Sequence, residues 1–129
     1  MQQLTQLRLQ ADQARLAAVT LKETNLRQTL QDLAHQRKQR LHAPEGSGDA
    51  ASVAGADLNW QLWVDQRRTT INAELARTLA EKEEVTVALR RSFGQDQAAQ
   101  RLHQAAQTAA RAAVSRRARY DSCRTNSIT

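Results

Sequence analysis

Histidines and carboxylates are the first side chains to consider for catalysis, because a general base must lie within hydrogen-bonding reach of its partner. The three histidines, His35, His42 and His103, lie on separate stretches of the chain. Asp32 precedes His35 by three residues, and two solvated side chains on a helix account for that spacing more simply than a catalytic pair does. The short motifs of metalloproteases, phosphate-binding loops and dinucleotide-binding folds are missing. We therefore predict that the protein is not an enzyme and that it uses no cofactor.

A metal site is the second kind of chemistry to consider. Glu81, Glu83 and Glu84 form the densest run of carboxylates, but no fourth ligand converges with them in the sequence, and such a run is typical of a solvated helix face. Cys123 is the single cysteine, so it has no partner for an intrachain disulfide, which is compatible with a reducing compartment. We predict no bound metal and a cytoplasmic location.

The positive charge is concentrated at the C-terminal end. Residues 1–97 hold 13 Lys and Arg against 12 Asp and Glu, whereas Asp121 is the only acidic residue after them. The arginines of this last stretch are Arg101, Arg111, Arg116, Arg117, Arg119 and Arg124. Such asymmetry predicts an acidic partner surface, either protein or nucleic acid. We favour a protein, because Tyr120 is the only aromatic residue of this stretch that could stack on a base, and no DNA-binding module is recognisable. A basic coiled-coil protein associated with nucleic acid is the alternative.

Two tryptophans lie close together in Leu58-Asn59-Trp60-Gln61-Leu62-Trp63-Val64. A protein made of two helices has little interior in which to bury two indoles, and an exposed Trp on a rigid element is a candidate interface residue. The alternative is that both rings pack against Leu33, Arg37 and Leu41 and close the end of a hairpin. The residues leave both interpretations open.

The elements that position these residues are predicted to be helices. Alanine, leucine, glutamine and arginine dominate, while aromatic residues make up 3% of the sequence and β-branched residues nowhere alternate over the length of a strand. No stretch has the apolar length of a membrane-spanning helix or the pattern of a signal peptide. The chain is therefore predicted to be all-α and soluble.

The first helix is predicted over about residues 3–42. Its apolar residues are spaced alternately three and four apart, as in a coiled-coil seam: Leu4, Leu7, Ala11, Ala14, Ala18 and Leu21. The pattern then continues through Leu26, Leu30 and Leu33 with a displacement of about one position, which predicts a stutter in the coiled coil.

A linker over about residues 43–57 and a second helix over about residues 58–120 complete the predicted fold. The linker contains the only proline and three of the four glycines, and Asp57 is expected to cap the second helix. The second helix carries one heptad seam, formed by Val64, Ile71, Leu75, Thr78, Lys82, Val85, Leu89, Ser92, Asp96, Ala99, His103, Ala106, Ala110, Ala113, Arg117 and Tyr120. We predict a single coiled-coil domain over 1–129, an antiparallel two-helix hairpin whose C-terminal helix is longer and lacks an intrachain partner after about Ala98.

This design resembles the FliJ family of bacterial flagellar export, which is similar to the stalk proteins of type III secretion. The resemblance rests on the aromatic segment Asn59-Trp60-Gln61-Leu62-Trp63-Val64 and on the unequal lengths of the two predicted helices. It implies a stalk that occupies the centre of a hexameric export ATPase and connects it to the cytoplasmic part of the membrane export gate.

The resemblance also implies which residues make these contacts. The basic end with Arg101, Arg111, Arg116, Arg117 and Arg119 would enter the ATPase ring. The opposite end would meet the gate through Leu33, Gln36, Arg40, Trp60, Trp63, Arg67 and Thr70. Export chaperones are further implied partners. The protein would then be cytoplasmic and peripheral at the inner membrane, with no membrane insertion and no nucleic acid bound.

Overall fold

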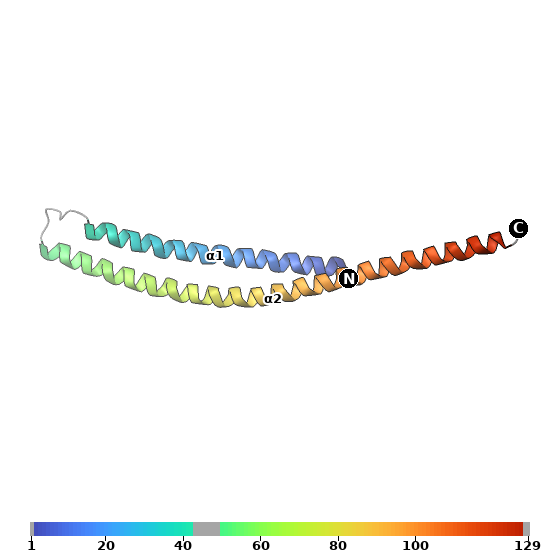
Figure 1. The fold of residues 1–129 in the computed structure, drawn as a ribbon. Coiled ribbons are helices and arrows are strands. Elements are labelled where there is room, and N and C mark those ends of the chain that lie inside the picture. Colours follow the sequence, from blue (N-terminus) through green and yellow to red (C-terminus); the bar gives the residue numbers. More distant parts are fainter. Residues whose placement is uncertain (1, 43–49, 128–129) are drawn as a thin grey trace. The chain divides into compact units, whose positions relative to one another are not determined.

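The computed structural model describes residues 2–42 and 50–127, and it contains two long helices. Helix α1 spans Gln2–His42 and helix α2 spans Ala50–Asn126 (Figure 1). No strand occurs within the described ranges. The predicted all-α fold class is confirmed.

Helix α2 is longer at both ends than the sequence predicts. It begins at Ala50, so the predicted linker over about 43–57 is wrong for residues 50–57, and it ends at Asn126 rather than at about residue 120. Residues 43–49 lie outside the described residues. The early start has a simple cause, because Ala50, Ala51, Ala54 and Ala56 favour a helix strongly enough to offset the cost of Gly55, which is about 1 kcal/mol relative to alanine. The prediction that Asp57 caps α2 is therefore wrong, since this residue lies inside the helix.

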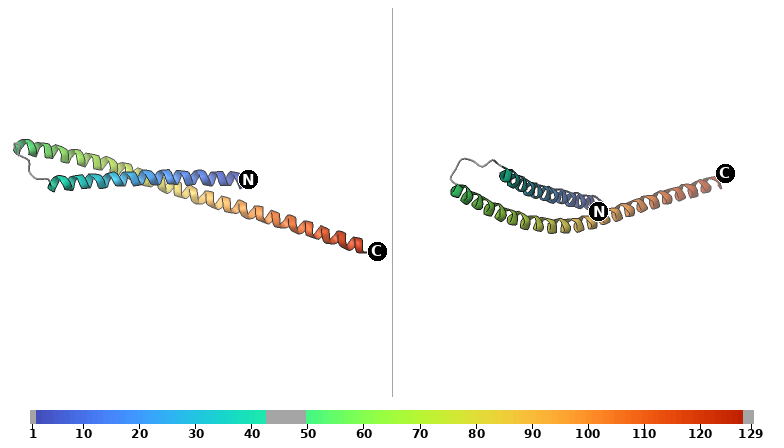
Figure 2. Two further views of the ribbon diagram at one scale, coloured as in Figure 1. Left: turned by 90° about the horizontal axis from the view of Figure 1, so that it is seen from above. Right: turned by 60° about the vertical axis from the view of Figure 1, so that its left-hand side comes forward.

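The structure divides into two compact units, which we describe separately. One unit comprises Met1–Gln13 and Ala88–Thr129, and the other comprises Ala14–Val87. Within each unit, a part of α1 packs against a part of α2 (Figure 2). The assignment of all 129 residues to a single domain stays a prediction.

The core of the unit Ala14–Val87 is aliphatic. Its most buried apolar side chains are Val19, Leu33, Val64, Ile71 and Val85. Burying a side chain of this size contributes about 1.5–3 kcal/mol, which makes these residues the main source of stability in this unit. Buried Thr78 is also satisfied, because its hydroxyl donates a hydrogen bond of 2.8 Å to the carbonyl of Glu74 on the same helix.

The packed seam of the unit with Met1–Gln13 and Ala88–Thr129 is largely polar. Asp12, Ser92 and Asp96 are buried, and the Ser92 hydroxyl donates a hydrogen bond to Asp12. The Thr5 hydroxyl lies 3.0 Å from Asp96 and donates to it. These side chains are paired across the two helices, so their burial does not leave a polar group without a partner.

The predicted seam of α1 is wrong from Leu4 to Leu21 and is confirmed at Leu26, Leu30 and Leu33, and the predicted stutter is wrong. Leu4, Leu7 and Leu21 are exposed, at 65%, 63% and 62% of their surface. Apart from half-buried Thr29, the positions that α1 buries or half-buries follow one uninterrupted heptad pattern instead: Gln2, Thr5, Leu9, Asp12, Leu16, Val19, Glu23, Leu26, Leu30 and Leu33. The prediction failed because it weighed only apolar residues, whereas three positions of the true seam hold polar side chains with a partner on α2.

The predicted seam of α2 is confirmed from Val64 to Ala99. Each of its positions in this range is buried or half-buried. From Arg101 to residue 127, every side chain is exposed, which includes the rest of the predicted seam from His103 to Tyr120. Neither described helix contains a stretch that is long and apolar enough to cross a membrane.

Candidate functional site

Arg40 contacts two residues of α2, Asp57 and Trp60, at one end of the unit Ala14–Val87. Its Nε donates a hydrogen bond of 3.0 Å to Oδ1 of Asp57, and Nη2 lies 3.0 Å from the same oxygen. Its guanidinium carbon lies 4.6 Å from the centroid of the Trp60 ring, within the range of a cation–π contact. One arginine of α1 therefore contacts both a carboxylate and an indole of α2.

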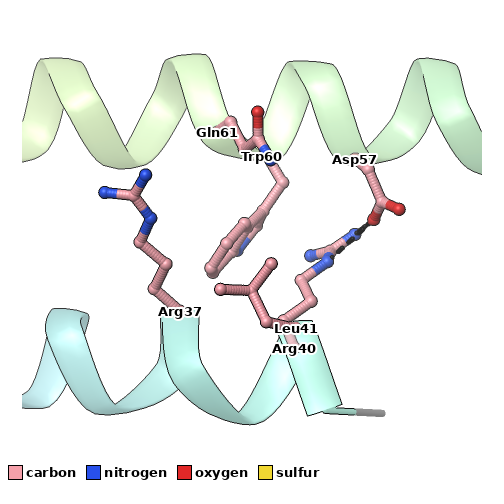
Figure 3. A pocket seen from close by; sticks show the side chains of 6 residues that line it. All are labelled: Arg37, Arg40, Leu41, Asp57, Trp60 and Gln61. Atoms are coloured by element: carbon pink, nitrogen blue, oxygen red, sulfur yellow. Dashed lines mark hydrogen bonds and ion pairs between the residues drawn. The ribbon is translucent and has the colours of Figure 1, made fainter. Parts of the chain in front are cut away.

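A small cavity of about 90 Å³ accompanies this contact. Figure 3 shows the Trp60 ring extending from α2 toward α1, between Arg37 on one side and the Arg40–Asp57 pair on the other. Leu41 and Gln61 complete the lining. Pockets for small molecules usually measure about 300–1,000 Å³, so this cavity is too small to hold a substrate or cofactor. The surface around it is a better candidate for contact with another protein.

The two tryptophans differ in their surroundings. Trp60 is half-buried under Arg40, whereas Trp63 is 52% exposed. Leu58 and Leu62, one helical turn apart on α2, are exposed beside them in the chain. We call Trp63, Leu58 and Leu62 the tip surface. Leu58 and Leu62 were not predicted as contact residues, although the absence of any charge from Leu58 to Val64 could have indicated an exposed apolar surface.

The other residues assigned to this end have different positions. Leu33 belongs to the packed seam and is 6% exposed, so a partner could not contact it without separating the helices. Gln36, Arg67 and Thr70 are exposed, and the Thr70 hydroxyl donates to the carbonyl of Gln66 at 3.0 Å. Of the residues proposed for the gate contact, Arg40 and Trp60 contact each other directly.

The arginines of the C-terminal segment of α2, from Arg101 to Asn126, form the second candidate surface. All five that were assigned to the partner contact are exposed: Arg101, Arg111, Arg116, Arg117 and Arg119. The hydrogen bonds of Arg116 to Ala112 and of Arg119 to Ser115 are long, at 3.4 Å, and local. Because each guanidinium carries five N–H donors, both arginines keep most of their donors for a partner.

This C-terminal segment also exposes apolar side chains. Leu102, Val114 and Tyr120 are all exposed, and a shallow hollow is lined by Ala110, Arg111, Val114, Ser115 and Ala118. Apolar patches and arginines together are typical of a helix that packs against another protein.

Glu23 forms the ion pairs within the seam of the unit Ala14–Val87. Its carboxylate lies 2.7 Å from Nζ of Lys82 on α2 and 2.9 Å from Nη2 of Arg27 on its own helix. The hydrogen bond from Lys82 lowers the pKa of Glu23 below its usual range, with smaller effects in the same direction from the charges of Lys82 and Arg27 and an opposing effect of burial. Glu23 therefore stays ionised at neutral pH, and its ion pair with Lys82 joins α1 to α2.

The residues considered for metal binding and redox chemistry are on the surface. Glu81, Glu83 and Glu84 are exposed, and the described part of the chain contains no group of three or more His, Cys, Asp or Glu side chains that could hold a metal ion. Cys123 is exposed on the C-terminal segment of α2.

Comparisons with known protein families, with curated proteins and with solved structures found no match to this chain. The tip surface and the C-terminal segment of α2 are the two surfaces from which a function can be inferred.

Proposed function

We propose that this protein is a non-enzymatic stalk, or coupling protein, of a bacterial flagellar or related type III export apparatus. The C-terminal segment of α2 binds the centre of a hexameric export ATPase, and the opposite end of the hairpin binds the cytoplasmic domain of the export gate. Export chaperones are further partners in this proposal. The protein acts in the cytoplasm, peripherally at the inner membrane. The choice of this machine rests on the resemblance of Asn59–Val64 to the aromatic segment of the FliJ family.

The proposal includes an antiparallel hairpin, and the interhelical contacts of each unit support it. In the unit with Met1–Gln13, Thr5 contacts Asp96, Arg8 contacts Gln95 at 3.3 Å and Asp12 contacts Ser92. In the unit Ala14–Val87, Glu23 contacts Lys82 and Arg40 contacts Asp57. Residue numbers fall along α2 as they rise along α1 in both units, which is the pattern of antiparallel neighbours.

The single observation that carries the proposal is the exposure of α2 from Arg101 to Asn126. Helix α2 has 77 residues and α1 has 41, and this last segment exposes every side chain. An isolated helix is only marginally stable in water, because most helical stability in proteins comes from packing an apolar face. A segment with exposed Leu102, Val114 and Tyr120 and six arginines against one acid is therefore suited to an acidic protein surface that surrounds it.

The tip surface supports the second contact of the proposal. Trp63, Leu58 and Leu62 are exposed beside the ordered Arg40–Trp60 contact, and tryptophan and arginine are enriched among residues that dominate binding energy.

The test is charge reversal in the C-terminal segment. Changing Arg111, Arg116, Arg117 and Arg119 to Glu is expected to abolish stimulation of the export ATPase from the same organism, measured as phosphate release. The circular dichroism of the variant should stay nearly unchanged, because these side chains are exposed. Stimulation by the unaltered protein should also fall as salt is raised, because exposed charges are screened.

A matched control changes the same number of exposed arginines on the part of α2 that packs against α1. Reversal of Arg68, Arg77, Arg90 and Arg91 alters the net charge equally and should leave stimulation largely intact. Normal stimulation by the C-terminal variant at low salt would contradict the proposal. If that variant loses DNA or RNA binding while ATPase stimulation is unaffected, the nucleic-acid alternative is correct.

A further inference from the structure

The cavity beside Trp60 is lined by two arginines and one carboxylate. Arg40 is paired with that carboxylate, Asp57, at 3.0 Å. Arg37 makes no hydrogen bond or ion pair with any residue in the described ranges, 2–42 and 50–127. Among the side chains that line the cavity, one guanidinium therefore has no anionic partner. We call this cavity the Arg37 pocket, and its lining residues are Arg37, Arg40, Leu41, Asp57, Trp60 and Gln61.

Two more hydrogen-bond donors of the Arg37 pocket are unused. Within the described part of the chain, neither the indole N–H of Trp60 nor the side-chain amide of Gln61 has a hydrogen-bond partner. No buried side-chain nitrogen or oxygen in that part lacks a partner, so the unpaired indole N–H of half-buried Trp60 reaches solvent. The Trp60 ring lies between Arg37 and the Arg40–Asp57 pair (Figure 3). Positive charge and unused donors together favour an anion as the ligand.

The size of the Arg37 pocket fits one small chemical group. A water molecule requires about 10–15 Å³ of such space, and the pocket provides about 90 Å³. A carboxylate is small enough for this volume, and it accepts parallel N–H···O bonds from a single guanidinium. The pocket therefore suits the end of one acidic side chain that belongs to a larger molecule.

The tip surface lies next to the Arg37 pocket. Gln61 lines the pocket, and the exposed Leu62 follows it directly in α2. Leu58 precedes Gln61 by three residues, so the two side chains are neighbours on the surface of the helix. A molecule with an acidic side chain in the pocket therefore has exposed apolar side chains within reach.

The exposed charges around the Arg37 pocket are mostly positive. Lys38 directly follows Arg37 in α1, and Arg67 and Arg68 follow the tip surface by about one turn of α2. All three are exposed, and the nearest exposed acid of α2 is Asp65. This distribution attracts an acidic partner and repels a basic one.

We propose that the Arg37 pocket receives an aspartate or glutamate side chain of a partner protein, whose neighbouring apolar residues pack on the tip surface. Arg37 donates to the carboxylate, with Trp60 and Gln61 as further donors. A nucleic-acid phosphate is a poorer occupant, because exposed Leu58 and Leu62 offer no ring on which bases could stack. This partner chemistry rests on the tip contact of the proposed function and adds the residue type that the partner must supply.

The test uses the full chain and two small probes, N-acetyl-glutamyl-leucinamide and its glutaminyl counterpart. The protein contains two tryptophans, so its nitrogen-15 NMR spectrum has two indole N–H signals, which Trp63→Phe distinguishes. The Glu probe should shift the Trp60 indole signal and the Nε–H signal of Arg37. Its dissociation constant should be at least about fivefold lower than that of the Gln probe, because only the Glu probe offers a charge-assisted hydrogen bond. Equal affinities would overturn the proposal.

A matched pair of variants locates the binding. Arg37→Gln should abolish the preference for the Glu probe, whereas Lys38→Gln removes the same charge from the next residue of α1 and should keep it. Both side chains are exposed, so the circular dichroism of both variants should stay unchanged. Arg37→Lys should retain only a part of the preference, since an ammonium lacks the planar fork of a guanidinium. A preference that survives Arg37→Gln and disappears in Lys38→Gln would show that the probe binds elsewhere, and the proposal would be wrong.

Dimethyl phosphate tests the rival occupant, because it carries the single charge of a nucleic-acid phosphate. Stronger binding of dimethyl phosphate than of the Glu probe, with shifts of the same signals, would overturn the proposal in favour of a phosphate.

Binding of the export gate domain separates this proposal from the proposed function. Arg37→Gln should weaken that binding at least about fivefold, and Lys38→Gln should leave it nearly unchanged. If the gate domain does not bind the unaltered protein while the Glu probe is still preferred, the gate contact is wrong and the carboxylate site stands. If the gate domain binds and Arg37→Gln affects neither gate nor probe, the gate contact stands and the carboxylate site is wrong.

Discussion

Trp60 and Trp63 are three residues apart, yet one indole packs and the other faces solvent. Trp60 is held under the guanidinium of Arg40, which is itself fixed by Asp57. Trp63 has more than half of its surface exposed. Trp60 therefore packs at the end of the paired helices, whereas Trp63 is available to a partner.

Alanine substitution of each tryptophan tests this difference. Trp63→Ala should change the free energy of unfolding by no more than about 0.5 kcal/mol, as for most surface substitutions, while weakening binding to the export gate domain. Trp60→Ala should cost about 1–3 kcal/mol, because it removes both packing and the contact with Arg40. Thermal unfolding followed by circular dichroism measures both effects. A sharp loss of stability in Trp63→Ala with unchanged partner binding would mean that the tip surface is part of the core.

Glu23 makes the stability of the unit Ala14–Val87 depend on pH. The hydrogen bond from Lys82 lowers the pKa of Glu23 in the folded protein, so the unfolded chain takes up the proton first as the solution becomes acidic. The stabilisation by Glu23 is therefore present at neutral pH. It is lost as pH falls below about 4.3, the ordinary value for glutamate, toward the lower folded-state pKa.

The variant Glu23→Gln should be less stable than the unaltered protein at pH 7, and the difference should shrink as pH falls through that window. Urea unfolding at a series of pH values measures it. Glu84→Gln is the control, because Glu84 is exposed on α2 and should show no such trend. A difference that stays constant with pH would contradict the ion-pair assignment.

At the scale of the elements, polar pairs determine which face of α1 meets α2. In the unit with Met1–Gln13, Thr5 contacts Asp96 and Asp12 contacts Ser92. Packing α2 against the predicted seam of α1, from Leu4 to Leu21, would instead place leucine or alanine opposite these buried polar groups. A buried polar group without a partner costs about 1–3 kcal/mol, so each polar group left unpaired would reduce the gain from a more apolar seam. Buried polar pairs of this kind set register at some cost in stability.

Removing one member of such a pair should be costly. Ser92→Ala is expected to destabilise the protein by about 1–3 kcal/mol, because the buried Asp12 loses a hydrogen bond. The double variant Ser92→Ala, Asp12→Ala should be destabilised by less than the two single effects combined, and urea unfolding of the four proteins measures that coupling. Ser115→Ala, at an exposed site of α2, is the control. Strictly additive effects would show that the pair does not act as a unit.

At the scale of the whole molecule, charge is distributed unevenly along the chain. The formal net charge is +6, and residues 98–129 contribute +5 of it. The charge of the C-terminal segment of α2 would steer an acidic partner to a helix with exposed apolar residues, which is why charge reversal there is the decisive test of the proposed function.

The sequence by itself determined that the chain forms long helices, because helix propensity is a local property of its alanine, leucine, glutamine and arginine residues. It also determined the seam of α2 from Val64 to Ala99, where apolar and polar residues follow one register. The exposure of the arginines from Arg101 onward followed from the excess length of that helix. Each of these features depends only on the residues of a single helix, so the periodicity of the sequence is sufficient to predict it.

Only the tertiary structure decided which of two heptad patterns on α1 is buried. Both patterns have the correct spacing, and the predicted one is wholly apolar from Leu4 to Leu21, but the choice depends on Ser92, Asp96 and Lys82 on the other helix. The same holds for Asp57, whose role as partner of Arg40 rather than helix cap depends on a contact with α1. It holds also for the tryptophans, since the position of Arg40 decides which indole is covered. In each case a polar or charged group of one helix pairs with a group of the other helix. Such pairing depends on both helices, so it cannot be predicted from the residue pattern of one helix alone.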